Sequence, residues 1–428
     1  MAETAGYLGN LQRGFEEIGC TCHFIDLTQH PFGYERTAAL PGPARWRGAF
    51  SRRIAALPRR SWRRLGWRAL TMLVDLLILA WAIGHADLFI FTGHDSLIWR
   101  NADLPLLRLL RKRVVWVFLG SDHRPPYLNG KRVRESLAAG EAGYPRMAER
   151  ARAFRTIVRR IERRADVVVA MSSSAQLHSR PFVHLLAIGI PHGQRNAEPE
   201  GTIAGEAGPA NIRILHSPSD PAKGSEAIRA CVTGLQGDGR VLDYREISGR
   251  PHDEVLEAID ECDLVVDQLY SDSPLAVFAT EAGYRGRAAI VGGYYAGAIA
   301  DDVAADLIPP SRFVLPDALC AAIDELSRDD GARLALGAEL ARFVRDRWSC
   351  ADVAGRYLQL ASGTAPSEWQ YDPARLRYVH GWGLAEAEIK DYVGALVDRC
   401  GSKALALDDH PALRDRLLAL AAPARSGA

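Results

Sequence analysis

Residues 211–293 constrain the fold most, because short apolar runs there repeatedly end in small or polar residues just where helical patterns begin. The run at 212–215 leads into a polar segment containing Lys223 and Gly224, and an apolar helical face follows. A second run, at 264–266, ends in Asp267 and Gln268. This alternation predicts a nucleotide-binding α/β unit with a lysine at a helix entrance.

The first half of the chain shows the same alternation. Apolar runs at 87–91, 114–119 and 166–170 predict strands, a short strand is expected at 23–27, and an opening helix precedes it. Polar side chains follow the runs, and ligands bind at the carboxyl ends of strands in doubly wound sheets. The residues that follow the first two runs are His94 and Asp95, then Asp122, His123 and Arg124.

Length and composition indicate two domains. The chain has 428 residues, of which 48% are hydrophobic and 25% charged, enough for a large core. The stretch 194–210 is rich in Gly, Pro, Ala and Glu and has no periodicity, so it is the predicted linker. We therefore expect a first domain at 1–193, a second at 211–345 and further helices at 346–428.

Charge and cysteine usage narrow the class of protein. A formal net charge of +1 suggests no polyanionic partner, and no motif supports nucleic-acid binding. Seven cysteines without a Cys-x-x-Cys spacing favour a reduced, cytoplasmic thiol set. The amino end shows no secretory signal. The apolar segment 69–84 is interrupted by Asp75 and is shorter than the roughly 20 residues of a bilayer span, so we expect a core-facing helix.

Residues 36–74 form a basic segment with ten arginines, no aspartate or glutamate, and three tryptophans. Such a segment is typical of a protein that lies on an anionic membrane surface, here the inner face of the membrane. A solvated face and a contact for an anionic acceptor are equally compatible with the pattern.

Three signatures in the second half resemble the donor-binding domain of the GT-B type glycosyltransferases, most closely glycosyltransferase family 4. They are Lys223-Gly224 after the first strand, Asp267-Gln268 after a later strand, and Glu281 followed by small residues, Gly286 and an apolar run. The resemblance implies an α/β fold of two Rossmann-like domains facing a central cleft. It also implies that the C-terminal helices cross back to brace the first domain.

The chemistry of these residues suits a nucleotide-sugar donor. Lys223, with Gly224, would hold the diphosphate and stabilise it as it leaves, together with the amino end of a helix expected to open at Ser273 and Pro274. The donor-binding candidates also include Leu275 and Ala276 there, and Arg250 near the base. By resemblance Glu281 accepts hydrogen bonds from the ribose hydroxyls.

The first domain should hold the acceptor. Asp122 is a candidate catalytic residue, as Lys223 and Glu281 of the second domain are. The acceptor-side candidates are His94, Asp95, His123 and Arg124. Each lies in a strand-end loop where capping a helix is the competing interpretation. Asp267 similarly caps a strand end on the simpler interpretation, and Lys223 and Arg250 could be ordinary surface cations.

The sequence departs from the family at two points. Ser273 stands where members usually carry a glutamate that contacts the transferred sugar, and the chain begins in a helix where members begin with a strand. The resemblance as a whole implies a retaining glycosyltransferase that uses no cofactor or bound metal and acts on a glycan, lipid-linked or protein acceptor. A sugar-nucleotide epimerase and a catalytically silent binding protein of the same architecture are the alternatives.

Overall fold

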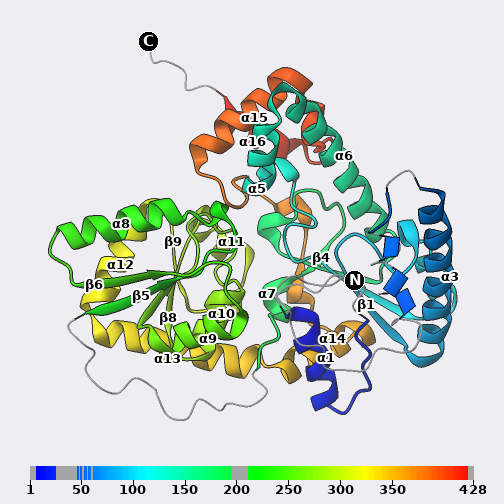
Figure 1. The fold of residues 1–428 in the computed structure, drawn as a ribbon, viewed down its shortest axis with the longest axis horizontal. Helices are drawn as coiled ribbons and strands as arrows, with labels where there is room; N and C mark the ends of the chain where they lie inside the picture. Colours follow the sequence, from blue (N-terminus) through cyan, green and yellow to red (C-terminus); the bar gives the residue numbers. More distant parts are fainter. Residues whose placement is uncertain are drawn as a thin grey trace.

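The computed structural model describes residues 6–25, 46–47, 49–50, 53–54, 56–58, 61–193 and 211–422. Within these ranges the chain forms two α/β domains, each built on one five-stranded sheet. Figure 1 shows them side by side, the second in green and yellow and the first in blue and cyan. The predicted α/β class with two Rossmann-like domains is confirmed.

The first sheet has the strand order β1-β2-β3-β4-β10 and is parallel except for β10, which pairs antiparallel with β4. Alternate residues of β2 face opposite sides: Val114 and Trp116 pack in one core cluster, and Val115 and Val117 pack in another. Burial of both faces explains the unbroken apolar runs of the sequence. The strands are β1 (Leu88–Thr92), β2 (Arg113–Val117), β3 (Val167–Ala170), β4 (Phe182–His184) and β10 (Gln370–Tyr371).

Helices cover both faces of this sheet. The opening helix α1 packs on the side of Val115, and α3 packs on the side of Trp116. The helices are α1 (Tyr7–Glu17), α3 (Trp62–His85), α4 (Leu104–Leu109), α5 (Gly130–Ala138), α6 (Gly143–Glu162) and α7 (Leu185–Ile188).

The second sheet is entirely parallel, with the order β6-β5-β7-β8-β9. The chain starts at β5, adds β6 on one side and then continues on the other, so the topological switch point lies between β5 and β7. The strands are β5 (Ile212–His216), β6 (Leu242–Glu246), β7 (Leu264–Val266), β8 (Ala288–Gly292) and β9 (Arg312–Val314). The helices are α8 (Ser225–Gly237), α9 (His252–Glu261), α10 (Val277–Tyr284), α11 (Ile299–Asp302), α12 (Leu319–Arg328) and α13 (Asp330–Arg347).

The C-terminal part returns to the first domain, as predicted. Helix α14 (Cys350–Ser362) packs so closely on α1 that a Cβ atom at Gly14 would lie 1.9 Å from the carbonyl oxygen of Cys350. The hydroxyls of Tyr7 and Tyr357 are 2.7 Å apart in this contact. Helices α15 (Glu386–Cys400) and α16 (Pro411–Ala421) lie beside α5 and α6, as Figure 1 shows.

One prediction about the first domain is wrong, and a second holds only in part. Residues 23–25 form no strand, and the rest of the expected strand at 23–27 lies outside the described residues. A short extended segment becomes a strand only when it pairs with a neighbour, and among the described strands β1 pairs with β2 alone. The apolar segment 69–84 belongs to a 24-residue helix, α3, but only one stripe of that helix faces the core, and 22% of its most apolar 18-residue stretch is buried.

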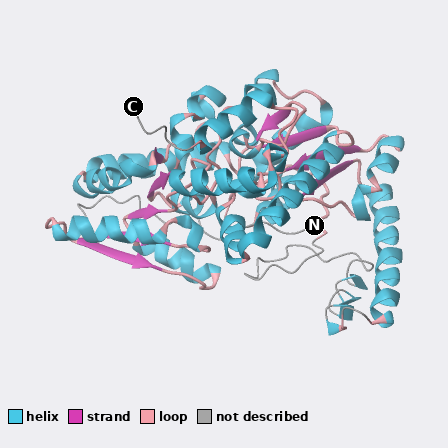
Figure 2. Cartoon of the chain, turned by 90° about the horizontal axis from the view of Figure 1, so that it is seen from above, coloured by secondary structure: helices cyan, strands magenta, loops and turns pink. Residues whose placement is uncertain are grey.

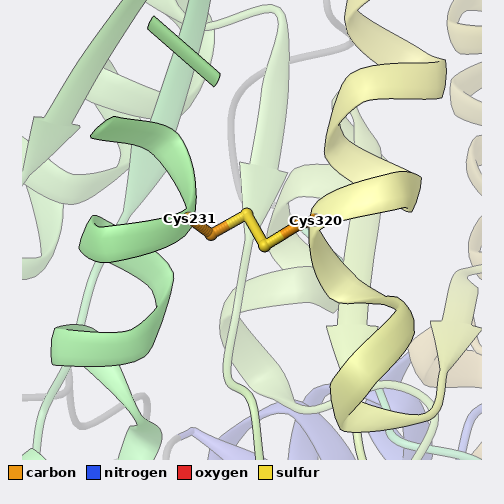
Figure 3. Close-up of a disulfide and its surroundings, with 2 residues drawn as sticks. All are labelled: Cys231 and Cys320. Atoms are coloured by element: carbon orange, nitrogen blue, oxygen red, sulfur yellow. A yellow bond between two sulfur atoms is a disulfide. The ribbon is translucent and has the colours of Figure 1, made fainter. Parts of the chain in front are cut away.

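The expectation of a fully reduced set of thiols is also wrong. Cys231 of α8 and Cys320 of α12 form a disulfide (Figure 3), and among the described residues the other cysteines are free. The two residues are 89 positions apart, and only the packing of α8 beside α12 brings them together. The pairing therefore leaves no local pattern in the sequence.

Candidate functional site

A lysine and an aspartate span the switch point of the second sheet. Lys223 lies in the loop after β5, and Asp267 directly follows β7. The Nζ of Lys223 donates to Oδ1 of Asp267 at 3.1 Å, and their side chains are 13% and 0% exposed. The second oxygen of Asp267, Oδ2, is buried without a hydrogen-bond partner in the described structure. Asp267 therefore holds the ammonium group at the point of the fold where ligands bind in open α/β sheets.

Glycine at position 224 allows this arrangement. Gly224 has a φ of 79°, in the left-handed region, and a Cβ atom there would lie 2.7 Å from the Cβ of Leu269. The amide of Leu269 donates to the carbonyl oxygen of Lys223 at 2.9 Å. Helix α8 then begins at Ser225, so the prediction of a lysine at a helix entrance is confirmed.

His216, the last residue of β5, lies beneath this loop. Its Nδ1 is 2.8 Å from the carbonyl oxygen of Val266, and its Nε2 is 2.9 Å from the hydroxyl of Ser225. Burial lowers the pKa of the ring. A neutral ring that donates from Nδ1 accepts from Ser225 at Nε2, which ties β5, β7 and α8 together.

Glu281 has the partner that its apolar surroundings require. Its Oε1 lies 2.6 Å from Nε2 of His252, the first residue of α9. The carboxylate is 8% exposed and the imidazole 38%. The hydrogen bond to Glu281 raises the pKa of His252, because it favours the charged imidazolium. The sequence signalled that Glu281 needs a partner, but it did not identify His252.

Arg250 lies two residues before this histidine and is exposed. Its guanidinium is 3.7 Å from the carboxylate of Glu254. Both side chains line a cavity of about 350 Å³ together with Arg245, Glu246 and Ile247. Arg250 therefore borders a cavity near the start of α9, where His252 lies, which leaves Arg250 as a candidate for contact with a base.

The helix after Ser273 starts later than the sequence suggested. Helix α10 begins at Val277, so Pro274 precedes the helix and does not lie in its first turn. The carbonyl oxygen of Pro274 accepts a hydrogen bond from Ser311 Oγ at 2.6 Å, and Ser273 Oγ donates to the carbonyl oxygen of Leu275 at 3.1 Å. These bonds hold 273–276 as a turn, and Ala276 caps the helix without a side-chain bond.

Loops at the carboxyl ends of both sheets meet at the domain interface. Arg124, after β2, donates from Nε to Asp272 Oδ2 at 2.9 Å, and both side chains are buried. Ser173, after β3, donates to the carbonyl oxygen of Asp272 at 2.5 Å. The hydroxyl of Ser172 is 2.7 Å from that of Tyr295, which follows β8. The strand-end loops of the two sheets therefore face each other, as predicted.

The C-terminal segment also reaches this interface, which the sequence did not indicate. Trp382 donates from Nε1 to Gln268 Oε1 at 3.0 Å, and the guanidinium of Arg124 lies 5.8 Å from the centre of a Trp382 ring. The amide of Gly383 donates to the carbonyl oxygen of Tyr270 at 2.8 Å. The one feature of the sequence that could have indicated this contact is the aromatic content of the segment around Trp382.

Asp122, His94 and Asp95 are further candidates of the first domain, and they differ in burial and in hydrogen bonding. Both carboxylate oxygens of Asp122 accept from the amide of Leu119, at 3.1 and 3.2 Å, and burial raises the pKa of the carboxyl. His94 Nε2 bonds the carbonyl oxygen of Asp122, while Asp95 is exposed. Asp122 thus caps its own turn, the competing role that its position in the sequence also allowed.

His123 belongs to a chain of buried polar groups inside the first domain. Its Nε2 is 3.0 Å from Ser174 Oγ, and its Nδ1 is 3.0 Å from His178 Nε2. His178 Nδ1 in turn lies 3.0 Å from Glu162 Oε1. Burial lowers the pKa of His123 well below its ordinary value, so the ring is neutral. The structure places His123 in the interior, next to Arg124 in sequence but away from solvent.

No protein-family model and no curated protein matches this chain. The crystal structure of Anabaena Alr3699/HepE in complex with UDP and glucose is similar over 68% of this chain and 82% of that chain, with 12% identity and a TM-score of 0.41. The glycosyltransferase SnogD from Streptomyces nogalater is similar over 64% of this chain and 99% of that chain, with 13% identity and a TM-score of 0.31.

Proposed function

We propose that the protein is a glycosyltransferase that transfers a sugar from a nucleotide-diphosphate donor bound to the second domain. The observation that carries the proposal is the Lys223–Asp267 pair, which fixes a cation at the switch point of a doubly wound sheet. The strand-end loops of the other domain face that edge of the sheet. A donor held there would lie between the two domains.

Lys223 suits the stabilisation of a leaving diphosphate. An ammonium group has three donor hydrogens, and the hydrogen bond to Asp267 uses one of them. Negative charge grows on the diphosphate as the bond to the sugar breaks, so a cation already oriented there stabilises the transition state more than the resting donor. The amino end of α10, at Val277, would add backbone donors.

Glu281 would accept hydrogen bonds from the ribose hydroxyls, by resemblance to family 4. The His252 contact at Oε1 orients the carboxylate. The same resemblance supports retention of configuration and transfer without a bound metal. Closure of the two domains would exclude water that could hydrolyse the donor.

One observation favours a second candidate, a binding protein without transferase activity. Ser273 stands where family 4 has a glutamate on the transferred sugar, and its hydroxyl bonds within its own turn. A panel of nucleotide sugars incubated with the purified protein separates the candidates. Transfer or slow release of nucleoside diphosphate supports the transferase, an isomerised sugar supports an epimerase, and calorimetric binding without turnover supports the silent protein.

Variants test the site itself. Lys223→Ala should lower turnover more than it raises the Michaelis constant for the donor, while Lys390→Ala, which changes a surface lysine on α15, should alter neither. Wild-type turnover in the Lys223 variant would show that this lysine pairs with Asp267 but does not stabilise the leaving diphosphate.

The ribose contact is tested by Glu281→Gln, which should weaken nucleotide binding by about 1.5–3 kcal/mol, the range for hydrogen bonds to charged groups. Glu257→Gln on the exposed side of α9 is the matched control. Calorimetry that finds equal affinities for both variants would exclude the ribose role.

A further inference from the structure

The long helix α3 lies at the outer edge of the first domain, and the described residues cover it on one side only. Val74, Ile78, Leu79 and Ala82 pack into the core of the domain. Figure 2 shows the helix at the right-hand margin with its other side facing outward. A helix that is apolar all round is normally buried all round, so the outward side of α3 needs an explanation.

The outward side is apolar over about four turns. Between residues 69 and 84 every exposed side chain is apolar, and the large ones are 38% to 58% exposed. These residues, which we call the outer face of α3, are Ala69, Leu70, Met72, Leu73, Leu76, Leu77, Ala80 and Gly84. The one charged residue in this range, Asp75, is buried and pairs with Arg47 at 2.6 Å. A contiguous apolar patch of this kind marks an interaction surface.

Cations and indole rings lie at the amino end of this face. Arg63, Arg64 and Arg68 belong to the first two turns of α3, together with Trp62 and Trp67. The guanidinium of Arg53 lies 4.8 Å from the centre of a Trp67 ring. Tryptophan rings settle at the boundary between lipid headgroups and acyl chains, and arginines bind the headgroup phosphates.

Charge selects a membrane over a second copy of this chain. The outer face of α3 exposes no carboxylate, so a second α3 packed against it would offer these arginines no acidic partner. An anionic bilayer supplies both an apolar layer for the leucines and phosphates for the arginines.

The packing of α3 also decides how the helix would meet a bilayer. By length and composition α3 is the one described helix that could cross a membrane. Its inner stripe, however, is part of the core of the first domain, so the helix remains on the surface of that domain. Only the outer face is free to enter lipid.

We propose that the outer face of α3 inserts into the headgroup–acyl boundary of an anionic membrane, with the helix lying in the membrane plane and Arg63, Arg64 and Arg68 on the phosphates. The inference is independent of the proposed enzymatic activity. The sequence of residues 36–74 suggested a contact through arginines alone. In the proposed arrangement the apolar side chains insert into the membrane and the arginines orient the helix.

Cosedimentation of the full chain with vesicles tests the proposal. The protein should bind vesicles of phosphatidylcholine that contain about 30% phosphatidylglycerol, because this fraction of anionic lipid gives the surface a clear negative potential. The combined variant Met72→Gln, Leu73→Gln, Leu76→Gln and Leu77→Gln should lower the partition coefficient by at least about tenfold. The matched control is Leu109→Gln with Leu137→Gln, two exposed leucines of the same domain, and should bind like the wild type.

The arginines are tested separately on the same vesicles. Arg63→Gln, Arg64→Gln and Arg68→Gln should each lower the partition coefficient roughly fivefold, and less at high salt. Arg146→Gln with Arg152→Gln, exposed on α6, is the charge-matched control. Thermal unfolding at the wild-type temperature shows that each variant is folded. For a variant that fails this check, the half-variants Met72→Gln with Leu73→Gln and Leu76→Gln with Leu77→Gln should each lose part of the binding.

Two results would overturn the proposal. One is vesicle binding that the glutamine variants of the outer face leave unchanged, or no vesicle binding at all. The other is a dimer in solution, detected by sedimentation velocity, that the same variants dissociate. Either result leaves the question of glycosyl transfer untouched.

Discussion

Two buried ion pairs of similar chemistry serve different purposes in this protein. Lys223–Asp267 lies within the second domain and joins the loops after β5 and β7, whereas Arg124–Asp272 joins one domain to the other. Opening of the domains would break the second pair and leave the first intact. The position of the Lys223 ammonium group therefore does not depend on the contact between the domains, whereas the Arg124–Asp272 pair does.

The largest expected effect comes from breaking the pair within the domain. Asp267→Ala leaves the Lys223 ammonium without its carboxylate in a mostly buried place, and loss of one partner of a buried pair lowers the free energy of unfolding by about 3–5 kcal/mol. Urea unfolding measures this loss. Glu325→Ala, which removes the partner of Arg312 in an ion pair exposed on both sides, should lower the free energy of unfolding by less than about 1 kcal/mol. Equal losses in the two variants would contradict a buried pair at the switch point.

Loss of the disulfide tests a second contact that lies within one domain and does not join the two domains. Cys320→Ser should lower the free energy of unfolding by about 2–4 kcal/mol, because Cys231 and Cys320 join helices α8 and α12 of the second domain across 89 positions. Cys400→Ser, at a free cysteine of α15, should leave stability unchanged. The contact between Arg124 and Asp272 should survive, so small-angle scattering should give the wild-type radius of gyration.

Breaking the Arg124–Asp272 pair between the domains should change the shape of the molecule more than its free energy of unfolding. Arg124→Ala leaves Asp272 without a cation in the closed form, which should shift the balance toward open domains by about 1.5–3 kcal/mol, the range for hydrogen bonds to charged groups. Small-angle scattering should then show a larger radius of gyration. Arg132→Ala, at an exposed pair with Glu135, is the control and should not expand the molecule. An unchanged radius in the Arg124 variant would mean that other contacts hold the domains together.

The smallest expected effect on stability concerns a third pair, His252–Glu281, which is partly exposed to solvent. The hydrogen bond to Glu281 raises the pKa of His252 above its ordinary 6.5, with Asp253 acting in the same direction and burial and Arg285 against it. The folded protein therefore holds this proton more tightly than the unfolded chain. The added stability is full below pH 6.5 and is lost as the pH rises through the raised pKa.

Unfolding measured across that range checks this sign. The stability difference between wild type and His252→Gln should shrink as the pH rises, by less than about 1 kcal/mol because His252 is more than a third exposed. A difference that grows with pH would contradict the assigned direction.

Much of the fold followed from local patterns. The runs that formed β1, β2, β3, β5 and β7 were all recognised, because strands buried on both faces are continuously apolar. The same patterns place Asp267 directly after β7 and Lys223 in the loop between β5 and α8. The extended segment at 23–25 was not, because strand pairing depends on a neighbour that the sequence does not name.

The sequence by itself determined the α/β class, the two domains' strand-and-helix order and the lysine-glycine entrance of α8. Tertiary structure alone decided which groups meet: Lys223 with Asp267 across 44 positions, Arg124 with Asp272 across 148, and Cys231 with Cys320. It also decided that Leu73 and Leu77 of α3 face outward while Val74 and Ile78 face the core. Secondary structure follows from periodicity within a few turns of chain, whereas burial and pairing depend on packing between segments distant in sequence.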